Sequence, residues 1–394
     1  MRSRSVVVVF GALTALFASG YGVMFTVLDE FRDQYGISEG ALGLIVAMGF
    51  LSSFLAQVTI APLADRGHAR VLIVIGMVLN VAGLLGMAYG TNVPVLLTAR
   101  FVMGVGVGFA YPAARRIVII AEPDRLGQNL GRLLAADVAG FAAGPAVSAV
   151  LVGPFGIAAP FLLIAAVMVA FFPLVLRTHV AETDADAEIP PRFAFDLLRI
   201  RPYMAAVAMG SAVFMMIGAF DALWALVLDD LHASDLIANL GITLFAVPVV
   251  LFGSIGGRLA QSIGPFRYGT MGLLVGAVAM VAYGHAPSGE IMLAISVIHA
   301  INDGLTVSSS GVAVGLVVPV ERQASAQGLL GGAQTLVAGI TATVIGQVYQ
   351  HFGRTMAYTS CAVAMVALII TGVALSGSSW RLRDVSARRS PVAV

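Results

Sequence analysis

The chain has 394 residues and a formal net charge of +1, and 59% of its residues are hydrophobic while only 11% are charged. Soluble chains carry about 25% charged residues, so this chain cannot cover itself with a water-facing surface. The near-zero net charge implies no polyelectrolyte partner such as nucleic acid. The single cysteine, Cys361, excludes an intramolecular disulfide framework and a thiolate metal cluster. Composition therefore predicts a membrane protein.

Apolar segments long enough to span a bilayer recur along nearly the whole chain, and we count twelve. In chain order they are 6–27, 41–61, 71–89, 94–118, 130–152, 156–176, 203–227, 236–259, 268–285, 291–318, 328–349 and 355–376. The first resembles a secretory signal in its basic start and its small residues. Its apolar residues continue to Val27 without a break, so we expect it to remain as a span.

One long polar segment divides these spans six and six. It is rich in acidic residues and contains two adjacent prolines, as a solvated connection would. We therefore predict a six-helix bundle over 1–176, a cytoplasmic linker over 177–202, a second six-helix bundle over 203–376 and a cytoplasmic tail over 377–394. The other loops are short and leave no room for a soluble catalytic domain.

The arginines follow an alternating pattern. With the N-terminus in the cytoplasm, only Arg32 and Arg354 fall outside the cell, and Arg100 lies within a span. Cytoplasmic loops of membrane proteins carry an excess of basic residues. The pattern predicts that both termini lie in the cytoplasm.

The two halves of the sequence are weakly similar to one another at an offset of 196 residues. Matched pairs at this offset include Leu63 with Leu259, Ala64 with Ala260, Gly76 with Gly272, Gly108 with Gly304 and Pro123 with Pro319. Parallel repeats of this kind place a substrate site at the interface of the two halves, near the middle of the bilayer.

Three motifs stand in the first half. The loop "APLADRGHARVL" carries Asp65, Arg66 and Arg70. The fourth span, "RFVMGVGVGFAYP", carries Arg100, Gly104 and Gly108. The fifth span contains "GFAAGPAVSA", with Gly140, Gly144 and Pro145. On these motifs the chain resembles the major facilitator superfamily, and within it the twelve-span drug:proton antiporters, from Val6 to about Ser376.

The resemblance implies a role for each motif. Asp65, Arg66 and Arg70 would form a gating loop that latches one state of the transporter, although Ala61, His68 and Ala69 depart from the family pattern. Arg100 would control proton transfer, and Gly104 and Gly108 would let another helix approach closely. Gly140, Gly144 and Pro145 match a packing motif associated with exporters rather than importers.

Four titratable side chains fall inside spans: Asp137, Asp221, His299 and Asp303. His299 and Asp303 lie four residues apart in "VIHAINDGL", so they share one helix face. A carboxyl group inside the membrane that gains and loses a proton can couple transport to a proton gradient. We expect Asp303 to carry the proton, His299 to tune it, and Asp137 and Asp221 to be secondary sites. The alternative is a structural pair, with Asp303 satisfied by Asn302.

Aromatic side chains within the spans are candidates for the cavity wall, because aromatics suit amphipathic or cationic guests. The candidates are Tyr21, Phe25, Tyr111, Phe220, Trp224 and Phe245, together with the amide of Asn302. Each of them could equally be a packing residue.

The sequence thus predicts an all-α integral membrane protein of twelve transmembrane helices in two pseudo-symmetric bundles, working by alternating access. We expect proton-coupled efflux of small hydrophobic or amphipathic compounds across a bacterial cytoplasmic membrane, by a monomer that needs no cofactor, metal or nucleic acid. The first alternative is a facilitator or proton symporter for a sugar, an amino acid or another small metabolite. A membrane enzyme would need a metal cluster or a nucleophile with its base, and His299 and His351 are isolated. A sensor or scaffold would move no solute.

Overall fold

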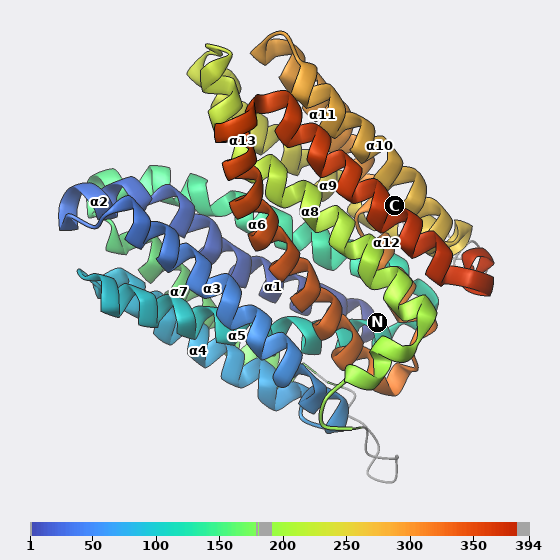
Figure 1. Ribbon diagram of the computed structural model, residues 1–394. Coiled ribbons are helices and arrows are strands. Elements are labelled where there is room, and N and C mark those ends of the chain that lie inside the picture. The colour runs from blue at the N-terminus through green and yellow to red at the C-terminus, as the bar shows by residue number, and fades with distance from the viewer. Residues whose placement is uncertain (1, 179, 181–190, 384–394) are drawn as a thin grey trace. The chain divides into compact units, whose positions relative to one another are not determined.

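The computed structural model describes residues 2–178, 180 and 191–383, which places the middle of the predicted linker and the end of the tail outside the described residues. The first half contains α1 (Arg2–Thr26), α2 (Leu28–Tyr35), α3 (Glu39–Thr59), η1 (Ala61–Arg66), α4 (Ala69–Tyr89), α5 (Val93–Ala121), η2 (Pro123–Arg125), α6 (Leu126–Phe155) and α7 (Ala158–Arg177) (Figure 1). The second half contains η3 (Phe195–Arg199), α8 (Arg201–Asp230), α9 (Asp235–Ile263), α10 (Pro265–His285), α11 (Gly289–Thr306), α12 (Ser309–Val317), η4 (Val320–Arg322), α13 (Gln323–Ser376) and η5 (Gly377–Arg381).

Within the described residues, eleven helical stretches are long and apolar enough to cross a membrane. The last of them, Val320–Arg381, has 62 residues, about three times the roughly 20 that a bilayer requires. Gly353 interrupts it with a φ of 79°, which is the left-handed region that glycine adopts readily. The chain turns there between two spans, so the twelve predicted spans are confirmed.

Two local features differ from the prediction. The short helix α2 follows α1 where a loop was expected, and it ends at Gly36 in a left-handed conformation. The predicted span 291–318 is broken into α11 and α12 at Val307 and Ser308. The break falls in the run "TVSSSG", where β-branched residues disfavour helix and serine hydroxyls compete for backbone hydrogen bonds.

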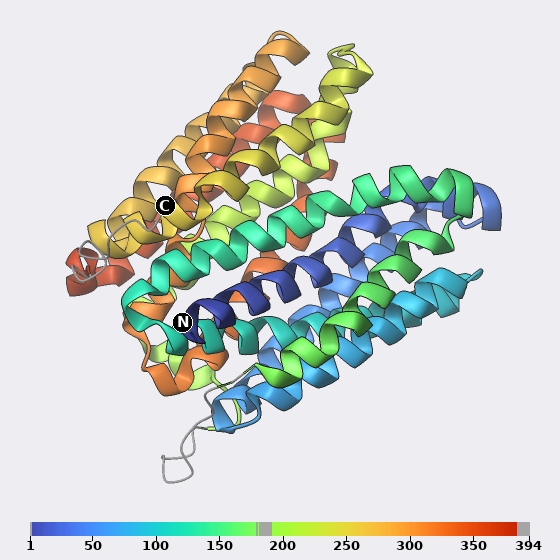
Figure 2. The same ribbon diagram turned by 180° about the vertical axis from the view of Figure 1, so that it is seen from behind.

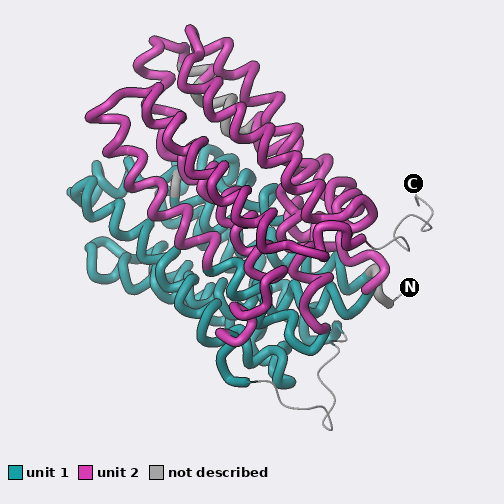
Figure 3. The backbone as a smooth tube through the Cα atoms, turned by 45° about the vertical axis from the view of Figure 1, so that its right-hand side comes forward, with its two compact units in different colours: residues 1–122, 136–194, 320–332 teal, residues 123–135, 195–319, 333–394 magenta. Residues whose placement is uncertain are grey.

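The chain forms two compact units, which Figure 3 shows in different colours. Unit 1 comprises 1–122, 136–194 and 320–332, and unit 2 comprises 123–135, 195–319 and 333–394. The first turns of α6 therefore belong to unit 2, and the first turns of α13 belong to unit 1. The offset of 196 residues relates these two exchanged segments to within one residue, so the exchange follows the internal repeat.

Small residues bring the helices of unit 1 close together. A Cβ atom at Gly140 of α6 would overlap the backbone of Ala15, and one at Gly144 would overlap the backbone of Gly22. Both contacts join α6 to α1, and the two helices run side by side in Figure 2. Similarly, Gly104 of α5 faces the backbone of α3 at Gly49. Without side chains between them, these helices pack at backbone distance, as membrane helices commonly do.

Candidate functional site

His299 of α11 is buried in unit 2 and contacts three polar side chains. Its Nδ1 lies 3.0 Å from the hydroxyl of Tyr283. Its Nε2 lies 3.0 Å from the sulfur of Met216 and 3.5 Å from Oδ1 of Asp303. With the Tyr283 hydroxyl donating to Nδ1, the neutral imidazole carries its proton on Nε2. That assignment lets the Nε2–H donate to the Met216 sulfur, with the Asp303 carboxylate as the next-nearest acceptor.

Asp303 is only 2% exposed. Its Oδ1 accepts a hydrogen bond from Asn302 Nδ2 at 3.2 Å, and Asn302 also donates to the carbonyl of Gly272 at 3.1 Å. Asp303 Oδ2 has no hydrogen-bond partner among the described residues. A buried, incompletely paired carboxylate is costly in its charged form. The surroundings of this side chain therefore suit a group that binds and releases a proton.

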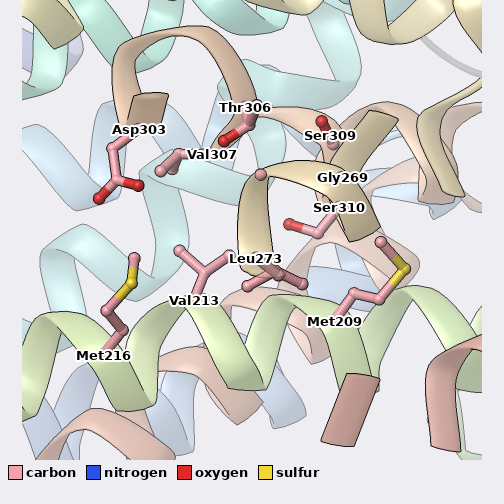
Figure 4. Close-up of a pocket in the computed structure, with 11 residues that line it drawn as sticks. Met209, Val213, Met216, Gly269, Leu273, Asp303, Thr306, Val307, Ser309 and Ser310 are labelled. Carbon is pink, nitrogen blue, oxygen red and sulfur yellow. The ribbon is translucent and has the colours of Figure 1, made fainter. Parts of the chain in front are cut away.

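Asp303 also lines a narrow cavity in unit 2, enclosed by α8, α10 and the α11–α12 break (Figure 4). The other lining residues are Met209, Val213, Met216, Gly269, Gly272, Leu273, Thr306, Val307, Ser309 and Ser310. The cavity has room for about one water molecule. The carboxyl group thus has a small solvent-sized space beside it.

A cluster of aromatic rings contacts the imidazole through Phe245 and Tyr283. Phe220 stacks on Trp224 at 4.8 Å between centroids, and it lies 4.7 Å from Phe245. Phe245 meets His299 edge-on at 5.5 Å. Trp224 is 1% exposed. These predicted cavity residues are therefore brought together, and they pack around His299 inside unit 2.

Arg100 of α5 is completely buried in unit 1. Its guanidinium carbon lies 3.8 Å from the ring centroid of Tyr21, and Gly49 leaves the space that it occupies. None of its three side-chain nitrogens has a hydrogen-bond partner in the part of the chain that the structure describes. A cation–π contact offsets only part of the cost of burying such a charge. Arg100 is the most incompletely satisfied charge among these candidates.

Asp137 of α6 joins a second polar cluster in unit 1. The Tyr111 hydroxyl donates to the Asp137 carboxylate and also lies 3.3 Å from the carbonyl oxygen of Thr14. Arg115, one turn beyond Tyr111 on α5, interacts electrostatically with Asp137. Sequence reasoning counted Arg115 only among the cytoplasmic arginines. Its i, i+4 spacing from Tyr111 was the signal that both side chains share a helix face.

Asp65 of η1 binds the start of α13. Its two carboxylate oxygens accept hydrogen bonds from the backbone N–H groups of Ala324 at 2.9 Å and Ser325 at 2.7 Å, and Oδ2 also accepts from the Ser325 hydroxyl at 2.6 Å. Arg116 lies 3.1 Å from Asp65, and the two side chains are 2% and 0% exposed. The carboxylate therefore caps a helix N-terminus, where negative charge is favoured. Arg116 is a partner that the sequence reasoning missed.

Gln261 of α9 makes an equivalent contact on α6, and the offset of 196 residues aligns it with Asp65. Its Oε1 accepts a hydrogen bond from the backbone N–H of Gly127 at 2.8 Å, and its Nε2 donates to the carbonyl of Asp124 at 3.3 Å. The repeat alignment could have identified this residue. The contact on α6 is neutral, whereas the contact on α13 is charged.

The remaining candidates are not gathered into these clusters. Asp221 is exposed on α8, and the Phe25 side chain lies outside the described residues. Arg66 is half-buried at the end of η1, whereas Arg70 donates hydrogen bonds to the carbonyls of Leu176 and Thr178 at the end of α7. Among the described residues, no three His, Cys, Asp or Glu side chains form a group that could hold a metal ion.

Solved structures share this fold. A structure of the human organic anion transporter MFSD10 superposes with a TM-score of 0.79 at 15% identity, covering 94% of this chain and 100% of that one. A structure of FucP in the outward conformation gives a TM-score of 0.75 at 17% identity, covering 94% of this chain and 99% of that one. At such low identity the similarity establishes the fold alone.

Sequence relatives match over shorter segments. The chain is 29% identical over 154 residues to a multi-drug resistance efflux pump PmrA homolog of Lactococcus lactis, covering 38% of each chain. It is 30% identical over 131 residues to the 4-hydroxybenzoate transporter PcaK of Pseudomonas aeruginosa, covering 33% of this chain and 29% of that one. It is 28% identical over 129 residues to the quinolone resistance protein NorA of Staphylococcus aureus, covering 32% and 33%. The matched segments thus span about a third of each relative.

Twelve spanning helices with ionisable groups buried inside the described residues define a multi-pass membrane protein. The model of the Major Facilitator Superfamily matches residues 9–229 and 212–392. The chain belongs to this superfamily.

Proposed function

We propose that this protein is a proton-coupled exporter of small hydrophobic or amphipathic compounds, working by alternating access in the cytoplasmic membrane. Asp303 carries the proton, and His299 orients the Asp303 carboxyl group and adjusts its affinity for the proton. The Asp65 cap on α13 stabilises one of the two states, and both termini lie in the cytoplasm.

The buried pair of His299 and Asp303 is the observation that best supports coupling of transport to protons. The carboxylate has one oxygen, Oδ2, without a hydrogen-bond partner among the described residues, and its other oxygen lies 3.5 Å from the imidazole Nε2. Protonation neutralises the carboxyl group and removes the cost of a buried charge. A conformational change that altered access to this site would therefore bind a proton on one side of the membrane and release it on the other.

The direction of transport rests on separate observations. Gly140 and Gly144 occupy the packing motif whose family pattern is associated with exporters, and both lie at backbone distance from α1. Two of the partial sequence relatives are named as a drug efflux pump and a quinolone resistance protein. Both observations favour export of amphipathic compounds.

A symporter for a small aromatic acid is the second candidate. The buried guanidinium of Arg100 lacks a hydrogen-bond partner among the described residues, and a carboxylate would satisfy it. A partial relative is named as a 4-hydroxybenzoate transporter. Export and symport differ in the direction of proton movement when substrate is added.

The test measures the interior pH of energised inside-out vesicles that contain the full-length protein. Ethidium, a fluoroquinolone, 4-hydroxybenzoate and a sugar are added in turn. An exporter dissipates the pH gradient on addition of ethidium or the fluoroquinolone, and Asp303→Asn abolishes this response. Asp229→Asn is the matched control, because that carboxylate is exposed at the end of α8.

Other outcomes would overturn parts of the proposal. If Asp303→Asn responds like the wild type, Asp303 does not carry the proton. If only 4-hydroxybenzoate moves protons, the protein is a transporter for aromatic acids.

A further inference from the structure

The residues that line the cavity beside Asp303 are spread along the helices that enclose it. On α8 its lining residues extend from Met216 to Met209, seven residues or about 10 Å of helix. On α10 it reaches Gly269, which is four residues, or about 6 Å, from the first residue of that helix at Pro265. The lining residues therefore lead from the buried carboxyl group towards the end of α10 that the arginine pattern places in the cytoplasm.

Three residues that follow Asp303 in the chain, Thr306, Ser309 and Ser310, place hydroxyl groups on the wall of this cavity. Thr306 Oγ1 donates to the carbonyl of Asn302 at 2.9 Å, which leaves its lone pairs able to accept. Ser309 Oγ is buried and has no hydrogen-bond partner among the described residues. Ser310 Oγ accepts from Gln334 of α13 at 3.4 Å and retains its own proton to donate. Figure 4 shows the three side chains spread along the α11–α12 break.

The helix break explains why polar groups can lie here. Because α11 ends at Thr306 and α12 begins at Ser309, the backbone between them is not continuous helix. Irregular backbone inside a membrane is tolerated where it lines a cavity or is buried in protein. The C-terminal end of α11 also carries a partial negative charge, which favours a positively charged species nearby.

We propose that protons exchange with Asp303 through the interior of unit 2, along the cavity lined by the hydroxyls of Thr306, Ser309 and Ser310, and not by way of bound substrate. This route rests on the proposed function of Asp303 as the proton carrier. Each hydroxyl, or a water between two of them, accepts one proton and releases its own, so no net charge stays in the chain. The proton ends on Asp303 Oδ2, the carboxylate oxygen without a hydrogen-bond partner among the described residues, while Oδ1 lies 3.5 Å from His299 Nε2.

The titratable groups that face this carboxyl group are few among the described residues. His299 lies on the same helix, and Tyr283 of α10 reaches it through the imidazole. From α8 the facing side chains are Met216 and Val213, which do not titrate. The proton route can therefore be tested by changing hydroxyls alone.

The experiment uses the purified full-length protein in lipid nanodiscs, without any substrate. Infrared spectroscopy records the band of protonated Asp303, identified by its loss in Asp303→Asn, and the rate at which that band shifts in D₂O. In the triple variant Thr306→Val, Ser309→Ala, Ser310→Ala we expect exchange to slow at least tenfold. Ser308→Ala is the matched control, because Ser308 is buried in the same run but does not line the cavity.

Each outcome decides between possibilities. Exchange at the wild-type rate in the triple variant would overturn the route while leaving Asp303 as the carrier. Loss of exchange in Ser308→Ala as well would indicate general disruption of the break and would also count against the route. If no band is lost in Asp303→Asn at any pH, the proposed function itself fails. Should the triple variant not fold, Ser309→Ala removes only a hydroxyl without a described partner, and Thr306→Ser should keep the wild-type rate.

Discussion

Replacing Asp65 by asparagine removes the negative charge that caps the start of α13. Asparagine keeps one acceptor oxygen, so one of the two backbone N–H groups of Ala324 and Ser325 loses its acceptor. A hydrogen bond to a charged group contributes about 1.5–3 kcal/mol, so we expect a loss of about 2–3 kcal/mol for the latched state. At 1.4 kcal/mol per factor of ten, its population falls about 30- to 150-fold relative to the unlatched state.

The ion pair with Arg116 contributes differently. Asp65 and Arg116 both lie in the first half of the sequence, so we expect their ion pair to be present in both states of the wild-type transporter. Asp65→Asn therefore removes it from both states. Leaving one partner of a buried pair uncompensated costs about 3–5 kcal/mol, which lowers overall stability without changing the ratio of states. The variant should therefore have a lower melting temperature as well as a shifted equilibrium.

Double electron–electron resonance measures the shift directly. Spin labels are placed at His68→Cys and Glu321→Cys, both exposed positions, after Cys361 is replaced by serine. We expect Asp65→Asn to add a population with a longer distance between the labels. Asp124→Asn provides the control, since it makes the same substitution at an exposed position. Identical distance distributions in Asp65→Asn and the control would refute the latch.

Three further predictions concern other residues. Tyr283→Phe removes the donor to His299 Nδ1, so we expect the pH profile of transport to shift. Substrate binding, measured by ethidium fluorescence, should stay the same. An unchanged pH profile would mean that Tyr283 does not set the tautomer of His299. Arg100→Met removes a buried charge without a described hydrogen-bond partner, so we expect a melting temperature in detergent at or above the wild-type value. Proton coupling should be lost. A large fall in melting temperature would show that the guanidinium is satisfied in the wild type. Gly140→Val forces α6 away from α1 and should reduce the folded yield in size-exclusion chromatography. Gly153→Ala, whose added Cβ meets no atom within 4 Å, should not reduce it. Equal yields would mean that close packing of α6 on α1 does not require a small residue at Gly140.

Residue pattern alone was enough to predict the spans, because a bilayer requires about 20 apolar residues wherever a helix crosses it. It located the polar side chains within those spans, since an ionisable residue stands out in an apolar sequence. The spacing of His299 and Asp303 predicted a shared face, and the two side chains are neighbours at 3.5 Å. These inferences depend on local order in the chain.

Contacts between distant segments required the tertiary structure. The hydrogen-bond partners of Asp65 on α13 lie more than 250 residues further along the chain, and nothing in the loop itself indicates that Ser325 will meet it. Likewise, Tyr283 and Phe245 reach His299 from two other helices, and Phe220 packs on Phe245 from a third. The break between α11 and α12 was also not predicted, because the mild helix-disfavouring signal of "TVSSSG" lies inside an apolar stretch long enough for one span.

One physical cause separates the features that the sequence predicted from those that only the tertiary structure revealed. The sequence by itself determined which segments enter the membrane and which ionisable groups they carry, because transfer into lipid depends on the composition of each segment. Which groups satisfy one another depends on how the helices pack, and between membrane helices small residues set that packing without a strong hydrophobic pattern to reveal it. Only the tertiary structure could therefore show that Arg100 lacks a hydrogen-bond partner among the described residues, while Asp65 acquires several.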